Sequence, residues 1–140
     1  MTTATARPLP AVGDQLPAMS VAATRTFVVA TAIATRDYQD VHHDHELAQQ
    51  KGSKDIFINI LTSNGLVSRF VTEWAGPASR LASISIRLGV PCYAGDTLNF
   101  SGEVTAVDGD RVTVAIKGDD SLGTHVSGNV VVIWPGEVRS

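Results

Sequence analysis

The clearest candidate for a catalytic site in this sequence is a carboxylate and an imidazole five positions apart. Asp37 and His42 lie in the polar run Arg36-Asp-Tyr-Gln-Asp-Val-His-His-Asp44. In a turning loop, this spacing can direct both side chains at one water molecule as a base and acid pair. Such a pair suits the addition of water to a double bond conjugated to a thioester, because one group must take a proton from water and a proton must reach the α-carbon. The enolate that develops needs a hydrogen-bond donor, typically a backbone N–H at the start of a helix.

The spacing leaves a structural alternative open. Asp37 can equally cap a turn, and His42, His43 and His45 can be solvated loop residues. The histidines match neither the His-Glu-x-x-His pattern nor a cysteine-containing zinc pattern, so the sequence predicts no metal site. His125 falls in a predicted strand, which favours a structural or surface role.

The sequence contains no other motif that is typical of a catalytic site. Cys92 follows Pro91 at the end of a predicted strand with no base near it in the sequence, which favours a small buried side chain. No Gly-x-Ser-x-Gly elbow, phosphate loop or dinucleotide fingerprint occurs. A single cysteine also excludes an intramolecular disulfide and is typical of a reducing compartment.

The elements that flank the Asp/His loop follow from local patterns. Residues 1–24 contain three prolines and are expected to form an extended N-terminal arm, followed by one domain over residues 25–140. Residues 27–35 are rich in β-branched side chains and predict a strand. A short helix is expected over residues 46–51, ended by Gly52.

In the second half of the sequence, the spacing of the apolar residues becomes regular. Apolar residues recur every three to four positions over residues 55–74, which predicts a long helix that Gly76-Pro77 ends. Four runs then alternate with period two, and Asp108-Gly109 is a hairpin turn signal between two of them. Four antiparallel strands with one apolar face each need a cover, and only the long helix can supply it. The expected fold class is α+β, a single hot-dog fold in which a curved antiparallel sheet wraps one central helix. Its open edges predict an oligomer.

Composition excludes several classes of partner. The chain of 140 residues is 44% hydrophobic and 18% charged, which fits one globular domain and not a disordered chain. Its net charge of −3 and 6% aromatic content provide no basic field or stacking surface for nucleic acid. The first twenty residues lack the apolar core of a signal peptide, and the longest nearly apolar run is about half of a bilayer span. We therefore expect a cytoplasmic protein with neither nucleic acid nor membrane as a partner.

The Asp37-x4-His42 spacing before a long helix resembles the MaoC-like, or R-specific, enoyl-CoA hydratase family. The segment 87–104, which contains Pro-x-x-x-Gly-Asp-Thr-Leu, resembles the family's strand-turn-strand segment. Three runs are similar to one subgroup, the small MaoC-like subunit of actinobacterial steroid side-chain enoyl-CoA hydratases. Those runs are Ala34 to Asp44, Gly52 to Thr62 and Glu73 to Pro77.

The resemblance implies a reaction and a partner. Asp37 and His42 would be the catalytic pair that activates water for addition to a steroid enoyl-CoA in cholesterol side-chain degradation. No cofactor is expected, because CoA is part of the substrate. The implied partner is a larger chain with its own MaoC-like domain, often joined to a DUF35 domain, in a heterotetramer. That partner would supply much of a pocket widened for sterol rings.

The sequence departs from the family pattern at two places. Gln39-Asp40 replaces an Asn-Pro pair in the catalytic loop, and Phe57-Ile58-Asn59 replaces Ala-His-Gly at the helix start. The expected oxyanion donor is therefore the backbone N–H of Asn59 or a neighbour, although Asn59 can equally be a polar residue on the outer helix face. The sequence does not identify the residues that bind CoA. Basic candidates for its phosphates are Lys51, Lys54, Arg69, Arg80 and Arg87.

Other functions also stay open. The chain can be a homodimeric R-specific hydratase of fatty enoyl-CoA, or a non-catalytic hot-dog subunit that completes a partner's pocket. Retention of Asp37 and His42 argues against the non-catalytic alternative. A hot-dog thioesterase is a further alternative, but the Asp-x4-His loop before the helix favours hydration over hydrolysis.

Overall fold

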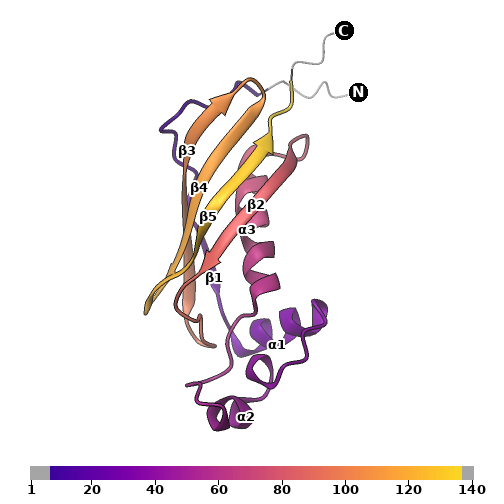
Figure 1. Cartoon of the computed structure of the whole chain (residues 1–140), viewed down its shortest axis with the longest axis vertical. Helices are drawn as coiled ribbons and strands as arrows, with labels where there is room; N and C mark the ends of the chain where they lie inside the picture. Colours follow the sequence, from indigo (N-terminus) through magenta and orange to yellow (C-terminus); the bar gives the residue numbers. More distant parts are fainter. Residues whose placement is uncertain (1–6, 137–140) are drawn as a thin grey trace.

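The fold is a curved antiparallel sheet beside one long helix, as a computed structural model of the chain shows for residues 7–136 (Figure 1). The strand order is β1-β3-β4-β5-β2. The strands are β1 (Met19–Ala22), β2 (Arg80–Leu88), β3 (Thr97–Asp108), β4 (Arg111–Asp120) and β5 (Gly123–Ile133). Helix α3 (Ile60–Ala75) lies along the sheet, and the shorter helices gather beyond one end of it. The expected hot-dog fold of class α+β is confirmed.

Helix α3 supplies the centre of the core. Its buried apolar residues Leu66, Val67, Phe70 and Val71 repeat at three- to four-residue steps and pack with inward-facing strand residues. The ring of Phe70 lies 5.7 Å from that of Phe100 on β3, centroid to centroid. Burying each such side chain contributes about 1.5–3 kcal/mol relative to exposure, so this helix holds the sheet in its curved form.

The four strands predicted after the long helix are confirmed, and the helix itself begins later than predicted. Asp108 pairs with Arg111 across a hairpin turn, as expected. Residues 55–59 are not helical, because they lie extended beside the loop that follows β2. The Ile58 N–H donates to the Cys92 carbonyl (3.0 Å), and the Ala94 N–H donates to the Ile56 carbonyl (2.9 Å).

The predicted strand over residues 27–35 is wrong, because this segment is helix α1 (Arg25–Ala34). Thr24 caps the helix by accepting a hydrogen bond from the Phe27 N–H (3.0 Å). Val28 and Ala32, four positions apart, are buried on its inner face. Cap and burial together outweigh the strand preference of the β-branched residues.

Two smaller elements complete the chain. The short helix predicted over residues 46–51 is confirmed as α2 (His45–Gln50), which Asp44 caps through the Leu47 N–H (3.0 Å). A single 3-10 turn, η1 (Asp40–His42), precedes it. None of the helices within residues 7–136 is long and apolar enough to cross a membrane.

The N-terminal segment extends the sheet of its own domain. Strand β1 pairs antiparallel with β3, and the Leu16 N–H donates to the Gly102 carbonyl (2.9 Å). Leu16 is buried in the core. Residues 13–22 of the expected arm therefore pair along β3 at the edge of the sheet. Residues 1–6 are outside the described part of the chain.

Candidate active site

The end of helix α1 fixes the position of Asp37. The Arg36 N–H donates to the Ile33 carbonyl (3.0 Å), and the Asp37 N–H donates to the Ala32 carbonyl (2.9 Å). These two bonds form a Schellman motif, which requires a left-handed residue after the helix. Arg36 supplies it with a φ of 56°. Asp37 thus stands three positions after the last residue of α1 and is tied to the helix by its own N–H, so it is not a residue of a free loop.

The left-handed Arg36 gives a prediction about stability. Arg36→Gly is expected to raise the free energy of unfolding by about 1 kcal/mol, because glycine adopts this conformation without the steric cost of a Cβ. Urea unfolding of the two proteins measures the difference. Arg36 is exposed, so the contacts of the Asp37 side chain are expected to stay unchanged. A destabilised variant would contradict the account of the Asp37 backbone given above.

His42 is held by its ring nitrogen Nδ1. That nitrogen lies 2.8 Å from the carbonyl oxygen of Phe57. Since a carbonyl can only accept, Nδ1 carries a hydrogen, and Nε2 of the neutral ring presents a lone pair. The Phe57 ring also packs edge-on against the imidazole, with centroids 4.9 Å apart. Both contacts fix the orientation of the ring.

Asp37 and His42 meet, as their spacing predicts. The distance from His42 Nε2 to Asp37 Oδ2 is 3.4 Å. The His42 side chain is 8% exposed and that of Asp37 is 20% exposed, so the pair is largely shielded from solvent. Nε2 of the neutral ring and the carboxylate oxygen both accept, and they are close enough for one water molecule to donate a hydrogen bond to each.

The third predicted residue, Asn59, joins this pair through its side chain. Its Nδ2 donates to Asp37 Oδ2 (3.1 Å) and to the Thr35 hydroxyl (2.8 Å). Its Oδ1 accepts from the Thr62 N–H (3.1 Å) and from the Thr62 hydroxyl, so Asn59 is also the N-cap of α3. With an exposed fraction of 2%, it does not lie on the outer face of the helix, and that alternative is wrong.

The side-chain roles of Asn59 and Thr35 were not predicted from the sequence. The signal for the cap was an asparagine three positions before Thr62, a pattern typical of a helix start. No local pattern points to the bond between Asn59 and Asp37, because these residues are 22 positions apart.

Backbone donors are available at the start of α3. Within residues 7–136, the N–H groups of Asn59, Ile60 and Leu61 have no hydrogen-bond acceptor, whereas that of Thr62 is satisfied by the cap. The free donors stand at the positive end of the helix dipole, where negative charge is stabilised. An oxyanion placed there would find both the donors and the dipole.

Large apolar side chains adjoin these polar groups in the sequence and are exposed. Ile33 lies four positions before Asp37, Tyr38 directly follows Asp37, and Ile60 and Leu61 follow Asn59. Their exposed fractions are 54%, 66%, 54% and 52% in that order. We refer to these four residues as the apolar rim. Exposed apolar side chains near a polar site are typical of surfaces that a ligand or partner covers.

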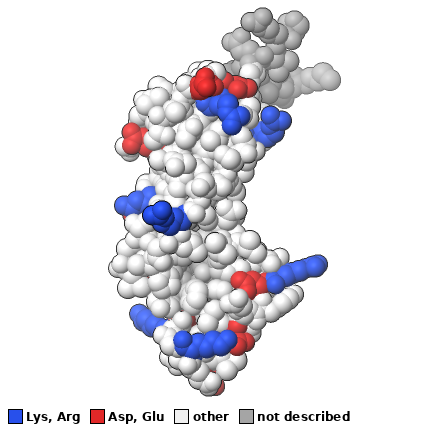
Figure 2. Space-filling model, viewed as in Figure 1, with Lys and Arg blue, Asp and Glu red and all other residues white. Residues whose placement is uncertain are grey.

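Two of the basic candidates for CoA phosphates form ion pairs with acidic residues of this chain. Lys51 pairs with Asp40 (2.9 Å), where its hydrogen bond and charge lower the pKa of that carboxyl. Arg69 pairs with Glu73 (2.8 Å). On the face drawn in Figure 2, basic and acidic side chains are scattered over a mostly uncharged surface. The structure therefore selects none of the five basic residues as a phosphate site.

The remaining histidines near the site have structural surroundings. His43 is exposed, and His45 Nδ1 lies 2.8 Å from a carboxylate oxygen of Asp55. Burial would raise the pKa of Asp55, but hydrogen bonds from His45 and the Ile56 N–H lower it overall. Within residues 7–136, no group of three or more potential ligands is placed to hold a metal ion, and the absence of a metal stays a prediction.

Cys92 is buried, as predicted. Burial, with the charges of Asp120 and Asp96, raises the pKa of its thiol to about 12. A thiol with that pKa carries almost no thiolate near neutral pH, so Cys92 is not a nucleophile.

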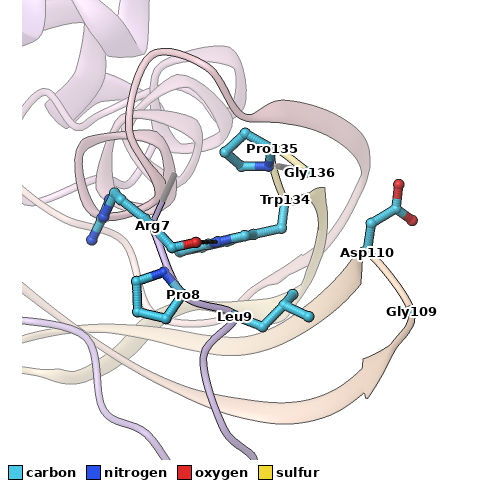
Figure 3. A pocket seen from close by; sticks show the side chains of 8 residues that line it. All are labelled: Arg7, Pro8, Leu9, Gly109, Asp110, Trp134, Pro135 and Gly136. Atoms are coloured by element: carbon cyan, nitrogen blue, oxygen red, sulfur yellow. Dashed lines mark hydrogen bonds between the residues drawn. The ribbon is translucent and has the colours of Figure 1, made fainter. Parts of the chain in front are cut away.

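One cavity of about 410 Å³ lies away from these residues (Figure 3). Arg7, Pro8 and Leu9 line one side of it, and the Trp134 indole lies between them and Pro135. The Trp134 Nε1–H donates to the Arg7 carbonyl (3.1 Å), which ties the two chain ends together. The cavity contains none of the candidate site residues and stands at the other end of the sheet from α1 and α2.

Comparisons with known proteins identify the family of this chain. The family model described as MaoC like domain matches residues 11–124. A Mycobacterium tuberculosis protein named 3-oxo-4,17-pregnadiene-20-carboxyl-CoA hydratase beta subunit is 56% identical over 119 residues, which are 85% of this chain and 92% of that protein.

Solved structures give the same result. A chain in the crystal structure of the ChsH1-ChsH2 complex from Mycobacterium tuberculosis matches with a TM-score of 0.88 and 53% identity, over 90% of this chain and 99% of that chain. The (R)-hydratase from A. caviae involved in PHA biosynthesis matches with a TM-score of 0.83 over 90% of this chain and 98% of that chain. At 22% identity, the latter shows a shared fold alone.

Proposed function

Because the chain belongs to the MaoC-like family, we propose that it is the small subunit of a hydratase acting on a steroid side-chain enoyl-CoA. The observation that carries this proposal is the 3.4 Å approach of His42 Nε2 to Asp37 Oδ2 beside the free N–H groups of α3. The substrate class is supported by the 56% identity to a protein named as a steroid carboxyl-CoA hydratase subunit.

The reaction uses the Asp37–His42 pair to activate one water molecule. Both acceptors hold the water, and the pair removes one proton as the water oxygen bonds to the β-carbon. The π electrons move toward the thioester oxygen, and the N–H groups at the start of α3 stabilise the enolate. The proton held by the pair then passes to the α-carbon. The product has gained one water, and the pair returns to its first protonation state.

Two hydrogen bonds prepare this pair before substrate arrives. The Phe57 carbonyl fixes the hydrogen of His42 on Nδ1, so Nε2 is the atom that accepts. The Asn59 amide holds Asp37 Oδ2 at 3.1 Å. Side chains held in this way need little reorganisation in the transition state. No cofactor takes part in these steps, and we propose that none is required.

The second part of the proposal is a larger partner subunit. The apolar rim is open in this chain, although it adjoins the catalytic pair in the sequence. A partner with its own MaoC-like domain would cover it and complete a pocket wide enough for sterol rings. A hetero-oligomer is supported by the match, at 53% identity, to a chain of the ChsH1-ChsH2 complex, and the predicted arrangement is a heterotetramer with a DUF35-containing chain.

Because acyl-CoA esters are intracellular metabolites, the proposed location is the cytoplasm.

Purified protein tests both parts of this proposal. The chain is assayed for water addition to a steroid enoyl-CoA and to crotonyl-CoA, alone and after co-expression with the neighbouring larger hydratase-like chain. We expect the complex to hydrate the steroid substrate at least about 100-fold faster than the chain alone, since the pocket is incomplete without its second wall.

The controls separate the alternatives. A complex with Asp37→Asn should assemble but lack activity, which shows that this chain contributes the catalytic pair. A homodimer that is fully active on crotonyl-CoA would instead favour the fatty enoyl-CoA hydratase. Unchanged activity of the Asp37→Asn complex would favour a non-catalytic subunit.

A further inference from the structure

A serine and a histidine form a fully buried pair beneath the first turn of α3. The Ser63 hydroxyl lies 2.7 Å from Nε2 of His125, which is on β5. The exposed fractions are 0% for Ser63 and 2% for His125. His125 Nδ1 lies 2.7 Å from the Val90 carbonyl. Since that carbonyl can only accept, Nδ1 carries a hydrogen, and the Ser63 hydroxyl donates to Nε2 of the neutral ring.

The pair is linked to the catalytic carboxylate through Asn59. The Ser63 N–H donates to the Asn59 carbonyl at 3.1 Å, and the Ser63 hydroxyl lies 3.2 Å from the same oxygen. The side chain of Asn59 in turn donates to Asp37 Oδ2. A continuous series of polar contacts therefore runs from Val90 through His125, Ser63 and Asn59 to Asp37.

The segment after β2 holds Asn59 from both directions. On one side, Cys92 and Ala94 pair by backbone hydrogen bonds with residues 56 and 58, just before Asn59. On the other side, Val90 anchors His125 and with it the first turn of α3. Asn59 lies between these two attachments, so both fix the backbone that carries its amide.

We infer that His125 and Ser63 are positioning residues that keep the Asn59 amide on the Asp37 carboxylate during catalysis. This inference rests on the proposed hydratase function. A nucleophilic role for Ser63 does not fit its complete burial, because no thioester carbon can reach its oxygen. The Ser63 hydroxyl instead ties the first turn of α3, which Asn59 caps, to His125 on β5 and through it to the segment after β2.

Ser63→Ala tests the inference, with Ser68→Ala as the matched control. Ser68 is on the same helix and donates to a backbone carbonyl four positions earlier (3.1 Å), but it has no link to Asn59. We expect Ser63→Ala to lower kcat of the complex about fivefold to tenfold and to leave KM within about twofold, as when one hydrogen bond to a charged group weakens. Ser68→Ala should change neither. A Ser63→Ala enzyme with unchanged kcat would overturn the inference, whatever its melting temperature.

A double-mutant cycle with Asn59→Ala tests whether Ser63 acts on Asp37 through Asn59. If Ser63 acts through Asn59, adding Ser63→Ala to Asn59→Ala should cause no further loss of kcat. The same fivefold to tenfold loss in both backgrounds would overturn that route.

A readout without substrate keeps this test separate from the proposed function. Solvent exchange of the Asn59 side-chain amide protons, followed by NMR, should accelerate at least about tenfold in Ser63→Ala and stay unchanged in Ser68→Ala. Unchanged exchange in Ser63→Ala would overturn the inference. If the wild-type complex hydrates neither substrate, the proposed function fails, and amide exchange still decides whether Ser63 and His125 position Asn59.

Discussion

Asp37→Asn is expected to lower kcat for water addition by about two to four orders of magnitude, the range that general acid–base catalysis contributes. Asparagine has nearly the shape of aspartate, and its carbonyl oxygen can still accept from the Asn59 amide, which lies 3.1 Å from Asp37 Oδ2. It cannot take a proton from water. Steady-state kinetics on the assembled complex, followed by loss of the enoyl-CoA chromophore, measures the effect.

Assembly serves as the control for this variant. Size-exclusion chromatography should show the same complex for Asp37→Asn as for wild type, because asparagine keeps the shape of the side chain and the backbone bond of residue 37 to α1 remains. His42→Ala should cause a loss of similar size, since it removes the other acceptor of the pair. Near wild-type turnover in either variant would refute the catalytic assignment.

Gly128→Ala is expected to lower the free energy of unfolding by about 3 kcal/mol, at the upper end of what overpacking usually costs. Gly128 on β5 pairs with Ile86 on β2. A Cβ at this position would lie 2.0 Å from the Ser85 carbonyl oxygen and 2.9 Å from the Ile86 Cα. Both are backbone atoms, so the two strands would have to separate. For a domain of this size, the melting temperature should fall by about 10 °C.

Gly65→Ala is the matched control for Gly128→Ala. Gly65 is exposed on α3, and a Cβ there would meet no atom within 4 Å. Alanine should stabilise this position by about 0.5–1 kcal/mol, because it loses less backbone entropy in a helix than glycine does. Thermal unfolding of both variants measures the contrast. Equal stability of Gly128→Ala and wild type would contradict the close contact between β2 and β5.

The strands were predictable from the sequence because the alternation of side chains is a local signal. From Arg80 to Ile133, each run of alternating residues corresponds to a strand of the sheet. Helix α1 was missed because its composition favours a strand, whereas the Thr24 cap and the burial of Val28 make it a helix. Composition gives only the average preference of each residue for helix or strand. Where that preference is weak, tertiary contacts decide which of the two forms.

Some contacts of the candidate site were likewise predictable from local sequence, and others were not. The approach of Asp37 to His42 was predictable, because five positions span a single turn of chain. The bond between Asn59 and Asp37 depends on how α1 and α3 pack, and that between Ser63 and His125 depends on how α3 meets the sheet. Such contacts join residues 22 and 62 positions apart, and no local pattern encodes them.

One asparagine is both the N-cap of α3 and the partner of Asp37, which couples local unfolding to turnover. When the first turn of α3 opens, the bond between Asn59 and the Thr62 N–H breaks, and the carboxylate loses its support at the same moment. Hydrogen exchange at the Thr62 amide therefore measures how often this turn opens, which in the proposed mechanism is the fraction of molecules that lack the support of Asp37. Substitutions elsewhere that promote opening of this turn should lower the rate in proportion to that fraction, even where they touch neither substrate nor catalytic residue.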